Sequence, residues 1–162
     1  MHESFDVKGI WHLAAYEEDL LPGQSPSTEP VWEETGTNLV VTAGKNLILE
    51  RLFGITGPPA AVASIGVGTD STAAVAGQTQ LNPTVAGTVL IQSVDSTPTR
   101  SSQTVTAIRT FTTAQANFQW NEVGAFNGNT NGTSTMLNRI VVGPFTKSAS
   151  VSIVVTLTFT QN

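Results

Sequence analysis

Residues 151–160, VSIVVTLTFT, constrain the fold more than any other part of the chain. Every second residue from Val151 to Phe159 is large and apolar, and four of the five residues that alternate with them are Ser or Thr. A period of two residues is that of a β-strand, whose side chains point in turn to opposite faces. One apolar and one polar face are typical of an antiparallel strand that covers a core. We therefore predict that the chain ends in a half-buried antiparallel strand.

Other segments share this strand character. They are rich in β-branched and aromatic residues and are separated by Gly, Pro and Asn, the residues that favour turns. We expect a bend near Asn121 and turns over 127–134 and 143–150. Many short strands between turns predict a mainly β fold, an antiparallel β-sandwich or a jelly-roll-like barrel. The expected strands are 5–16, 31–41, 61–68, 88–94, 104–113, 116–126, 135–142 and 151–160.

One short helix is expected near residues 43–53. Thr42 is a suitable N-cap, and Gly54 is a suitable residue to end the helix in a left-handed conformation. Within the segment, Leu47, Ile48, Arg51 and Leu52 follow the spacing of one helical face. This spacing supports the prediction of a helix.

The acidic residues gather near the N-terminus. Residues 1–51 carry a net charge of −6, whereas the rest of the chain carries +1. Three prolines between 22 and 30 exclude a helix interior or a central strand there. We therefore expect residues 1–37 to form an acidic, Pro-containing N-terminal strand and arm, and residues 38–162 to form the β-sandwich body, as one domain overall. The acidic segment is either a solvated surface or a contact with a basic partner.

Composition argues against several classes of function. Only 12% of residues are charged and the net charge is −5, so the clustered basic residues of a nucleic-acid site are missing. The apolar runs are too short to cross a bilayer, and the N-terminal residues do not resemble a secretory signal. There is no cysteine, which excludes a disulfide scaffold and a thiolate metal site. We expect no cofactor, no nucleic-acid partner and no membrane partner.

Catalytic motifs are also missing from the sequence. The two histidines, His2 and His12, have no second ligand at metal-binding spacing and no nucleophile motif to act with. The glycines at 66 and 68 lack the third glycine and the helix of a dinucleotide site and indicate the end of a strand. Adjacent acids at 17–19 and 33–34 are typical of solvated surfaces. We therefore expect a protein that is not an enzyme.

Six residues are candidates for structural or interface roles. Glu122 is the only acid after Asp95, and Arg139 in the next expected strand is its natural partner. A buried pair of this kind would hold a bend in place or contact a neighbouring subunit. Aromatic side chains supply large apolar areas to cores and interfaces. The complete set of candidates is Trp11, Trp32, Trp120, Glu122, Phe126 and Arg139.

Several motifs resemble those of small virion proteins of tailed bacteriophages. In that group a W-x-E-x-G-L-F segment precedes M-L-x-R and a K-[ST] turn, and the N-terminal part reads KGIWH, WEE and NLVT-x-G-x-N-x-LL. Ala125 stands where the group often has Leu. The matching parts of this chain are WNEVGAF at 120–126, MLNR at 136–139, Lys147, VKGIWH at 7–12, WEE at 32–34 and NLVVTAGKNLIL at 38–49.

The resemblance implies a structural part of the virion. We expect a capsid decoration or cement protein, a homotrimer on the capsid surface whose partner is the major capsid protein or another virion protein. In this view the acidic N-terminal segment reaches across joints of the shell. A tail baseplate or fibre-attachment protein is the first alternative. A carbohydrate-binding module of the virion, which would stack a sugar on an exposed Trp, is the second.

Overall fold

The computed structural model of the protein describes residues 7–55, 60–82 and 87–161 and shows a mainly β fold with one short helix. All strand pairs in it are antiparallel. The elements are β1 (Val7–Tyr16), β2 (Trp32–Thr37), β3 (Leu39–Val40), α1 (Thr42–Phe53), β4 (Ser64–Gly68), β5 (Val89–Ser93), β6 (Thr99–Ser101), β7 (Thr104–Phe111), β8 (Gln119–Phe126), β9 (Met136–Thr146) and β10 (Ser152–Gln161).

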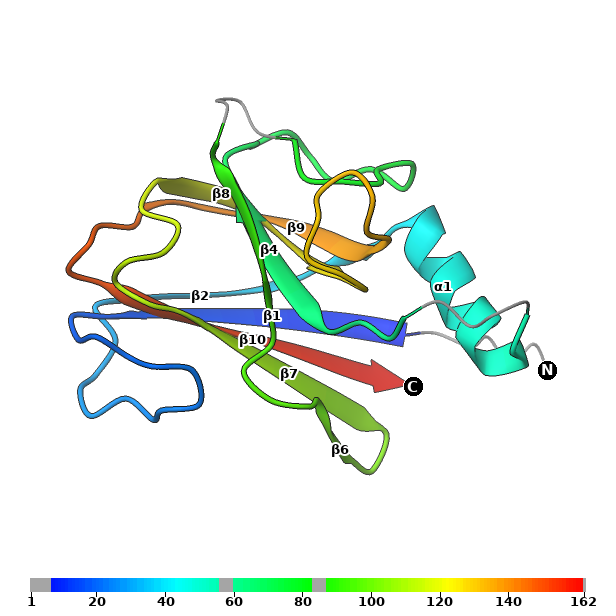
Figure 1. Ribbon diagram of the computed structural model, residues 1–162, viewed down its shortest axis with the longest axis horizontal. Coiled ribbons are helices and arrows are strands. Elements are labelled where there is room, and N and C mark those ends of the chain that lie inside the picture. Colours follow the sequence, from blue (N-terminus) through cyan, green and yellow to red (C-terminus); the bar gives the residue numbers. More distant parts are fainter. Residues whose placement is uncertain (1–6, 56–59, 83–86, 162) are drawn as a thin grey trace.

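The strands form two five-stranded sheets that pack face to face (Figure 1). Sheet A has the order β2-β1-β10-β7-β6, and sheet B has the order β3-β9-β8-β4-β5. Sequential hairpins such as β4–β5 and β8–β9 make up much of this pairing, whereas a jelly roll joins its neighbours mainly through crossings between sheets. The prediction of two packed antiparallel sheets is confirmed, but the jelly-roll form is not.

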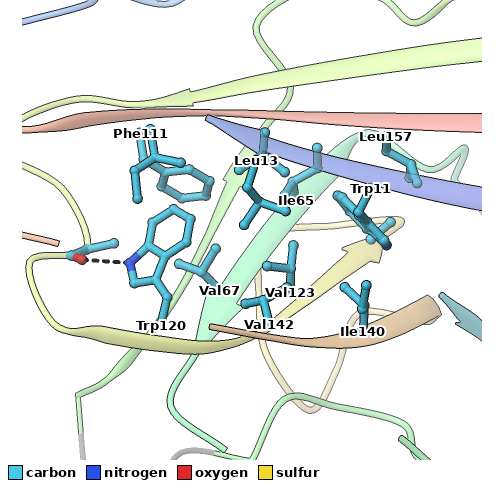
Figure 2. Packing of buried hydrophobic residues seen from close by; sticks show 14 of the residues in the cluster. Trp11, Leu13, Ile65, Val67, Phe111, Trp120, Val123, Ile140, Val142 and Leu157 are labelled. Carbon is cyan, nitrogen blue, oxygen red and sulfur yellow. Dashed lines mark hydrogen bonds between the residues drawn. The ribbon is translucent and has the colours of Figure 1, made fainter. Parts of the chain in front are cut away.

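The main core lies between the sheets (Figure 2). Trp120 is fully buried, packs edge-on against Phe111 with ring centroids 5.1 Å apart, and donates from its indole nitrogen to the carbonyl of Ala116 at 3.0 Å. That hydrogen bond satisfies the polar atom of a side chain that is otherwise wholly surrounded by apolar groups. Trp11, Leu13 and residues of β10 face it from sheet A.

The last strand has the two faces that its sequence predicts. Ile153, Val155 and Leu157 are buried in the core, whereas Thr156 and Thr158 are on the opposite, partly exposed face. β10 pairs with β1 on one side and with β7 on the other, so it is the central strand of sheet A. Its apolar face therefore supplies the middle of one wall of the core.

A second apolar cluster lies on the outer face of sheet B. Gly66 and Gly124 are paired on neighbouring strands, and a Cβ atom at either position would crowd Leu81 and Phe126, and at Gly66 it would also collide with Ile91. The two glycines leave a trough that these apolar residues fill, together with Ile91. The loop formed by residues 69–82 therefore covers this face of sheet B.

The helix forms where it was predicted, but its start differs. Val41 is the N-cap, without a side-chain hydrogen bond, so Thr42 is the first helical residue instead of the cap. Gly54 ends the helix in the left-handed conformation with φ 61°, as expected. Gly44 and Leu47 face the body, whereas Leu52, which shares the expected helical spacing with Leu47, is 67% exposed.

The reason for this orientation is the close approach at Gly44. A Cβ atom at this position would lie 2.0 Å from the carbonyl oxygen of Leu137 in β9. Glycine alone permits this distance, so the helix turns its glycine toward the sheet. Leu49, Leu52 and Phe53 of the same helix are exposed.

Some strand boundaries also differ from the predictions. The expected strand 31–41 is divided between β2 in sheet A and β3 in sheet B. β9 continues to Thr146, so the expected turn over 143–150 is shorter. β6 was not predicted, because its three residues, TRS, carry no apolar pattern. The bend near Asn121 is present as a register shift between Trp120 and Glu122.

The acidic segment folds onto the body. β1 is paired along its whole length with β10, which places it inside sheet A. In the loop formed by residues 17–31, Glu18 accepts hydrogen bonds from Ser27 and Thr28, and Leu20 is fully buried. Residues 7–37 therefore lie in the sandwich and its connecting loop and do not form a projecting arm. Residues 1–6 lie outside the described residues.

Candidate functional site: a buried ion cluster and an open sheet face

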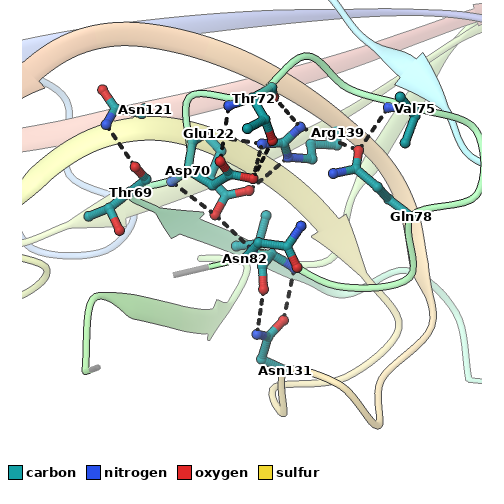
Figure 3. A network of polar contacts seen from close by, with 11 residues as sticks. Thr69, Asp70, Thr72, Val75, Gln78, Asn82, Asn121, Glu122, Asn131 and Arg139 are labelled. Carbon is teal, nitrogen blue, oxygen red and sulfur yellow. Dashed lines mark hydrogen bonds and ion pairs between the residues drawn. The ribbon is translucent and has the colours of Figure 1, made fainter. Parts of the chain in front are cut away.

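Glu122 and Arg139 form the most buried ion pair of the described chain (Figure 3). The Nε atom of Arg139 donates to Oε2 of Glu122 at 2.7 Å, and both side chains are inaccessible to solvent. β8 and β9 are neighbours in sheet B, and Glu122 lies opposite Val141, two residues from Arg139. Residues in this diagonal position are within reach of long side chains, so the strand register alone brings the pair together.

The register shift at Asn121 decides which face Glu122 occupies. In a regular strand Trp120 and Glu122 would share one face. The shift lets Trp120 enter the main core while Glu122 points to the outer face of sheet B, where Arg139 lies. The bend therefore keeps a carboxylate out of the apolar core.

Arg139 also binds the loop 69–82. Its Nη1 atom donates to the carbonyl of Thr72 at 2.8 Å and to Oε1 of Gln78 at 3.3 Å. Its Nη2 atom donates to the carbonyl of Asp70 at 3.1 Å and to the carboxylate of Asp70 at 3.2 Å. The guanidinium group is thus surrounded by acceptors from a loop far away in sequence.

Glu122 holds the same loop through its second oxygen. Oε1 accepts from the backbone amide of Asn82 at 3.0 Å and from that of Asp70 at 3.4 Å. Asn131 adds a side-chain bridge to both backbone groups of Leu81. The cluster, defined by Asp70, Glu122 and Arg139, therefore fastens the loop 69–82 over the second apolar cluster.

The two carboxyl groups respond differently to this environment. Burial raises the pKa of Glu122 above its usual range, although Arg139 acts in the opposite direction. Burial also acts to raise the pKa of Asp70, but the hydroxyl and amide of Thr72 together with Arg139 outweigh it and leave that pKa lowered. The surroundings therefore favour the ionised form of Asp70 and disfavour that of Glu122.

The cluster is buried from solvent, and its contacts hold the loop 69–82 in place. Every charged group in it is hydrogen-bonded to another member or to the loop backbone, and Glu122 and Arg139 have no exposed atoms. No room is left at the pair for a substrate. Asp70, the third member, was not predicted as a site residue, because its turn carries no charge pattern that points to an arginine 69 residues away.

Asp95 and Lys147 are two further buried charges that hold loops in place. Asp95 accepts from Arg109 at 3.3 Å, from the hydroxyl of Thr110 at 2.6 Å and from the amide of Gly23 at 3.2 Å. Lys147 is buried and donates to Oδ1 of Asn117 at 2.8 Å. Burial lowers the pKa of Lys147 to about 8, against the attraction of Asp19.

The remaining candidate residues are parts of the packing. Trp11, Trp120 and Phe126 are fully buried, and Trp32 is partly buried with its ring stacked on Phe145 at 4.5 Å. Trp11 and Trp120 are therefore not available to stack on a sugar ring, and this part of the carbohydrate-binding alternative is wrong. Tryptophan at these positions fills the core because its size matches the space between two sheets.

The outer face of sheet A is the broad open surface of the sandwich. The side chains that share it form rows across the strands, such as Thr106–Thr158–Ile10 and Ile108–Thr156–His12. The loop 17–31 covers only the end near Ser152, to which Leu20 donates through its backbone amide. We call this surface the threonine face, and it comprises Lys8, Ile10, His12, Thr35, Thr37, Thr104, Thr106, Ile108, Thr156, Thr158 and Thr160.

The threonine face is poor in charge and contains exposed apolar residues. Ile10 is 38% exposed and Ile108 is 41% exposed. Lys8 lies at one end of β1, and His12 is 3.4 Å from Glu33 of β2. The sequence indicated the alternation that produces this face, but only the strand order shows that the Thr residues of β7 and β10 lie side by side.

Residues 7–55, 60–82 and 87–161 contain no group of three or more His, Cys, Asp or Glu side chains that could hold a metal ion. In the same part of the chain, no helix is long and apolar enough to cross a bilayer. Comparisons with protein-family models, with curated proteins and with solved structures gave no match.

Proposed function

We propose that the protein is a structural component of a tailed-bacteriophage virion, a capsid decoration or cement protein that binds the shell through the threonine face. The observation that carries the proposal is this broad, charge-poor face with Ile10 and Ile108 exposed within it. The motifs at 120–126 and 136–139 support the same class of protein.

The chemistry of the face suits a permanent protein–protein contact. Charged groups in the centre of an interface must lose their hydration, whereas threonine hydroxyls are desolvated at lower cost. Threonine is also stiff at χ1, so its burial orders few additional rotamers. A flat sheet face of this kind fits another regular surface, such as a capsid lattice, better than it fits a small ligand.

The rigid loops of the sandwich support a passive structural role. The ion cluster and the buried pair of Asp95 and Arg109 fix surface loops that would otherwise be mobile. Loops that change conformation during catalysis have few such contacts. In this proposal the protein adds stability to the particle as a homotrimer and turns over no substrate.

The test is the position of the protein on virions and its dependence on the threonine face. Immunogold labelling of virions and of tail-less heads should place the protein on the head surface. Purified Ile108→Lys protein should bind undecorated heads at least about tenfold more weakly than wild type, because a charge is buried in the contact. Val75→Lys, on the loop 69–82 at the other side of the molecule, is the matched control.

Each other outcome has a definite meaning. Label on the tail tip would select the baseplate or fibre-attachment alternative. Label on neither part of the particle would refute a virion role. Unchanged binding by Ile108→Lys would show that the threonine face is not the docking surface.

A further inference from the structure

We infer that the outward face of α1 is a self-association surface, on which parallel α1 helices of sister copies pack around a rotation axis. This inference rests on the proposed function, because it assigns the contact that would hold the homotrimer together. It starts from an unusual exposure of apolar residues. Leu49, Leu52 and Phe53 are 50%, 67% and 69% exposed, and Ile55 directly after the helix is 55% exposed.

Two of these residues, Leu49 and Phe53, lie at core positions of a heptad pattern. Thr42, Asn46, Leu49 and Phe53 have the spacing d, a, d, a, and Lys45, Glu50 and Leu52 flank them at g, e and g. The body-facing residues Gly44 and Leu47 then occupy f and b, on the opposite side of the helix. The heptad positions and the burial pattern of α1 thus identify the same solvent-exposed face.

The charges select sister copies in parallel orientation as the occupant. In parallel helices a g residue lies beside the e residue five positions further along in the neighbour, so Lys45 meets Glu50 of the next copy. In an antiparallel pair that sets Asn46 against Leu49, Lys45 would lie beside Leu52 and Glu50 beside Ala43, so neither charge would gain a partner of opposite sign. Asn46 at an a position is the kind of polar residue that fixes the alignment of such helices.

Parallel packing leads to a closed assembly. Helices related by a rotation axis along their length produce cyclic symmetry, in which every copy has the same contacts. A helix of 12 residues is only about 18 Å long, too short to hold a coiled coil by itself. The sandwich holds α1 in its helical form before association, so self-association does not depend on the stability of the isolated helix. α1 lies at the end of the sandwich where β1 begins and β10 ends, away from the loop 17–31 (Figure 1).

The experiment measures the mass of the full chain in solution by light scattering over a range of concentrations. Lys45→Glu and Glu50→Lys each place like charges at the contact and should raise the dissociation constant at least about tenfold. The double exchange Lys45→Glu/Glu50→Lys restores opposite charges and should return the constant to within about threefold of wild type. Both exchanges suit the helix dipole, so weaker association would not reflect loss of the helix.

Apolar variants provide a second line of evidence with a matched control. Leu49→Ser should weaken association at least as strongly as one charge reversal, because it removes the central d residue. Leu21→Ser changes a leucine on the loop 17–31 that is 62% exposed, more than the 50% of Leu49. This control should leave the mass unchanged.

Several results would overturn the inference. A wild-type monomer at every concentration would do so, as would an oligomer that persists in all α1 variants. Failure of the double exchange to restore association would refute the parallel arrangement, and an equal effect of Leu21→Ser would refute the assignment to α1. None of these results decides the position of the protein on the virion, which the labelling experiment tests separately.

Discussion

Replacement of Arg139 by methionine is the most informative perturbation of the ion cluster. Methionine keeps most of the apolar length of arginine but removes the guanidinium group. The variant loses the 2.7 Å contact with Glu122, both contacts with Asp70 and the contacts with Thr72 and Gln78. The carboxylates of Asp70 and Glu122 then remain at this site without a cation.

The expected cost follows from that uncompensated charge. Removal of one partner of a buried ion pair typically destabilises a protein by about 3–5 kcal/mol. Glu122→Gln has a smaller effect, about 2 kcal/mol, because Asp70 still neutralises Arg139 and the side-chain oxygen can still accept from Asn82. If the two groups act as one unit, the double variant costs about 2 kcal/mol less than the sum of the single variants.

Urea unfolding followed by tryptophan fluorescence measures these values, since Trp11 and Trp120 are buried in the core. Glu33→Gln removes the carboxylate of the exposed pair with His12 and should change the free energy of unfolding by less than about 0.5 kcal/mol. An Arg139→Met cost below about 1 kcal/mol, or strictly additive single effects, would refute the view that the cluster locks the loop.

Three further predictions concern particular packing and charge contacts. Gly68→Ala should cost about 1–3 kcal/mol because its Cβ would lie 2.4 Å from Oε1 of Glu122, whereas Gly77→Ala, with open space at its Cβ, should cost far less in the same unfolding assay. The pKa of Lys147 is lowered to about 8 from 10.5, so the unfolded state binds the extra proton between these values and stability should rise by about 3 kcal/mol across that pH window. Lys147→Met should abolish this rise, and an unchanged pH profile would contradict the assignment. Ile153→Ala should lower the free energy of unfolding by about 2–5 kcal/mol, and a cost below about 1 kcal/mol would contradict its place in the core.

The parts of the fold that could be predicted from sequence are those governed by local periodicity. β10 follows a two-residue pattern, and its faces are as expected. The end of α1 at Gly54 depends on the conformational freedom of one residue. The pairing of Glu122 with Arg139 was predictable because the two residues are on strands joined by one short connection.

The orientation of α1 could not be predicted in the same way. Leu52 fits the expected helical spacing as well as Leu47 does, and nothing in the helix itself shows which of the two is buried. The choice is made by Gly44, which contacts the backbone of Leu137 in a strand more than 90 residues away. The outward apolar face of α1 is a consequence of that contact.

By itself, the sequence determined the conformation of the strands, the position of the helix and the low charge of the surface, because these depend on neighbouring residues. The tertiary structure decided the rest. It brought Asp70 to Arg139, placed Trp11 and Trp120 in the core and set the threonines of β7 and β10 side by side. These features depend on which strands become neighbours, and that choice is made by the packing of two whole sheets, which no local pattern specifies.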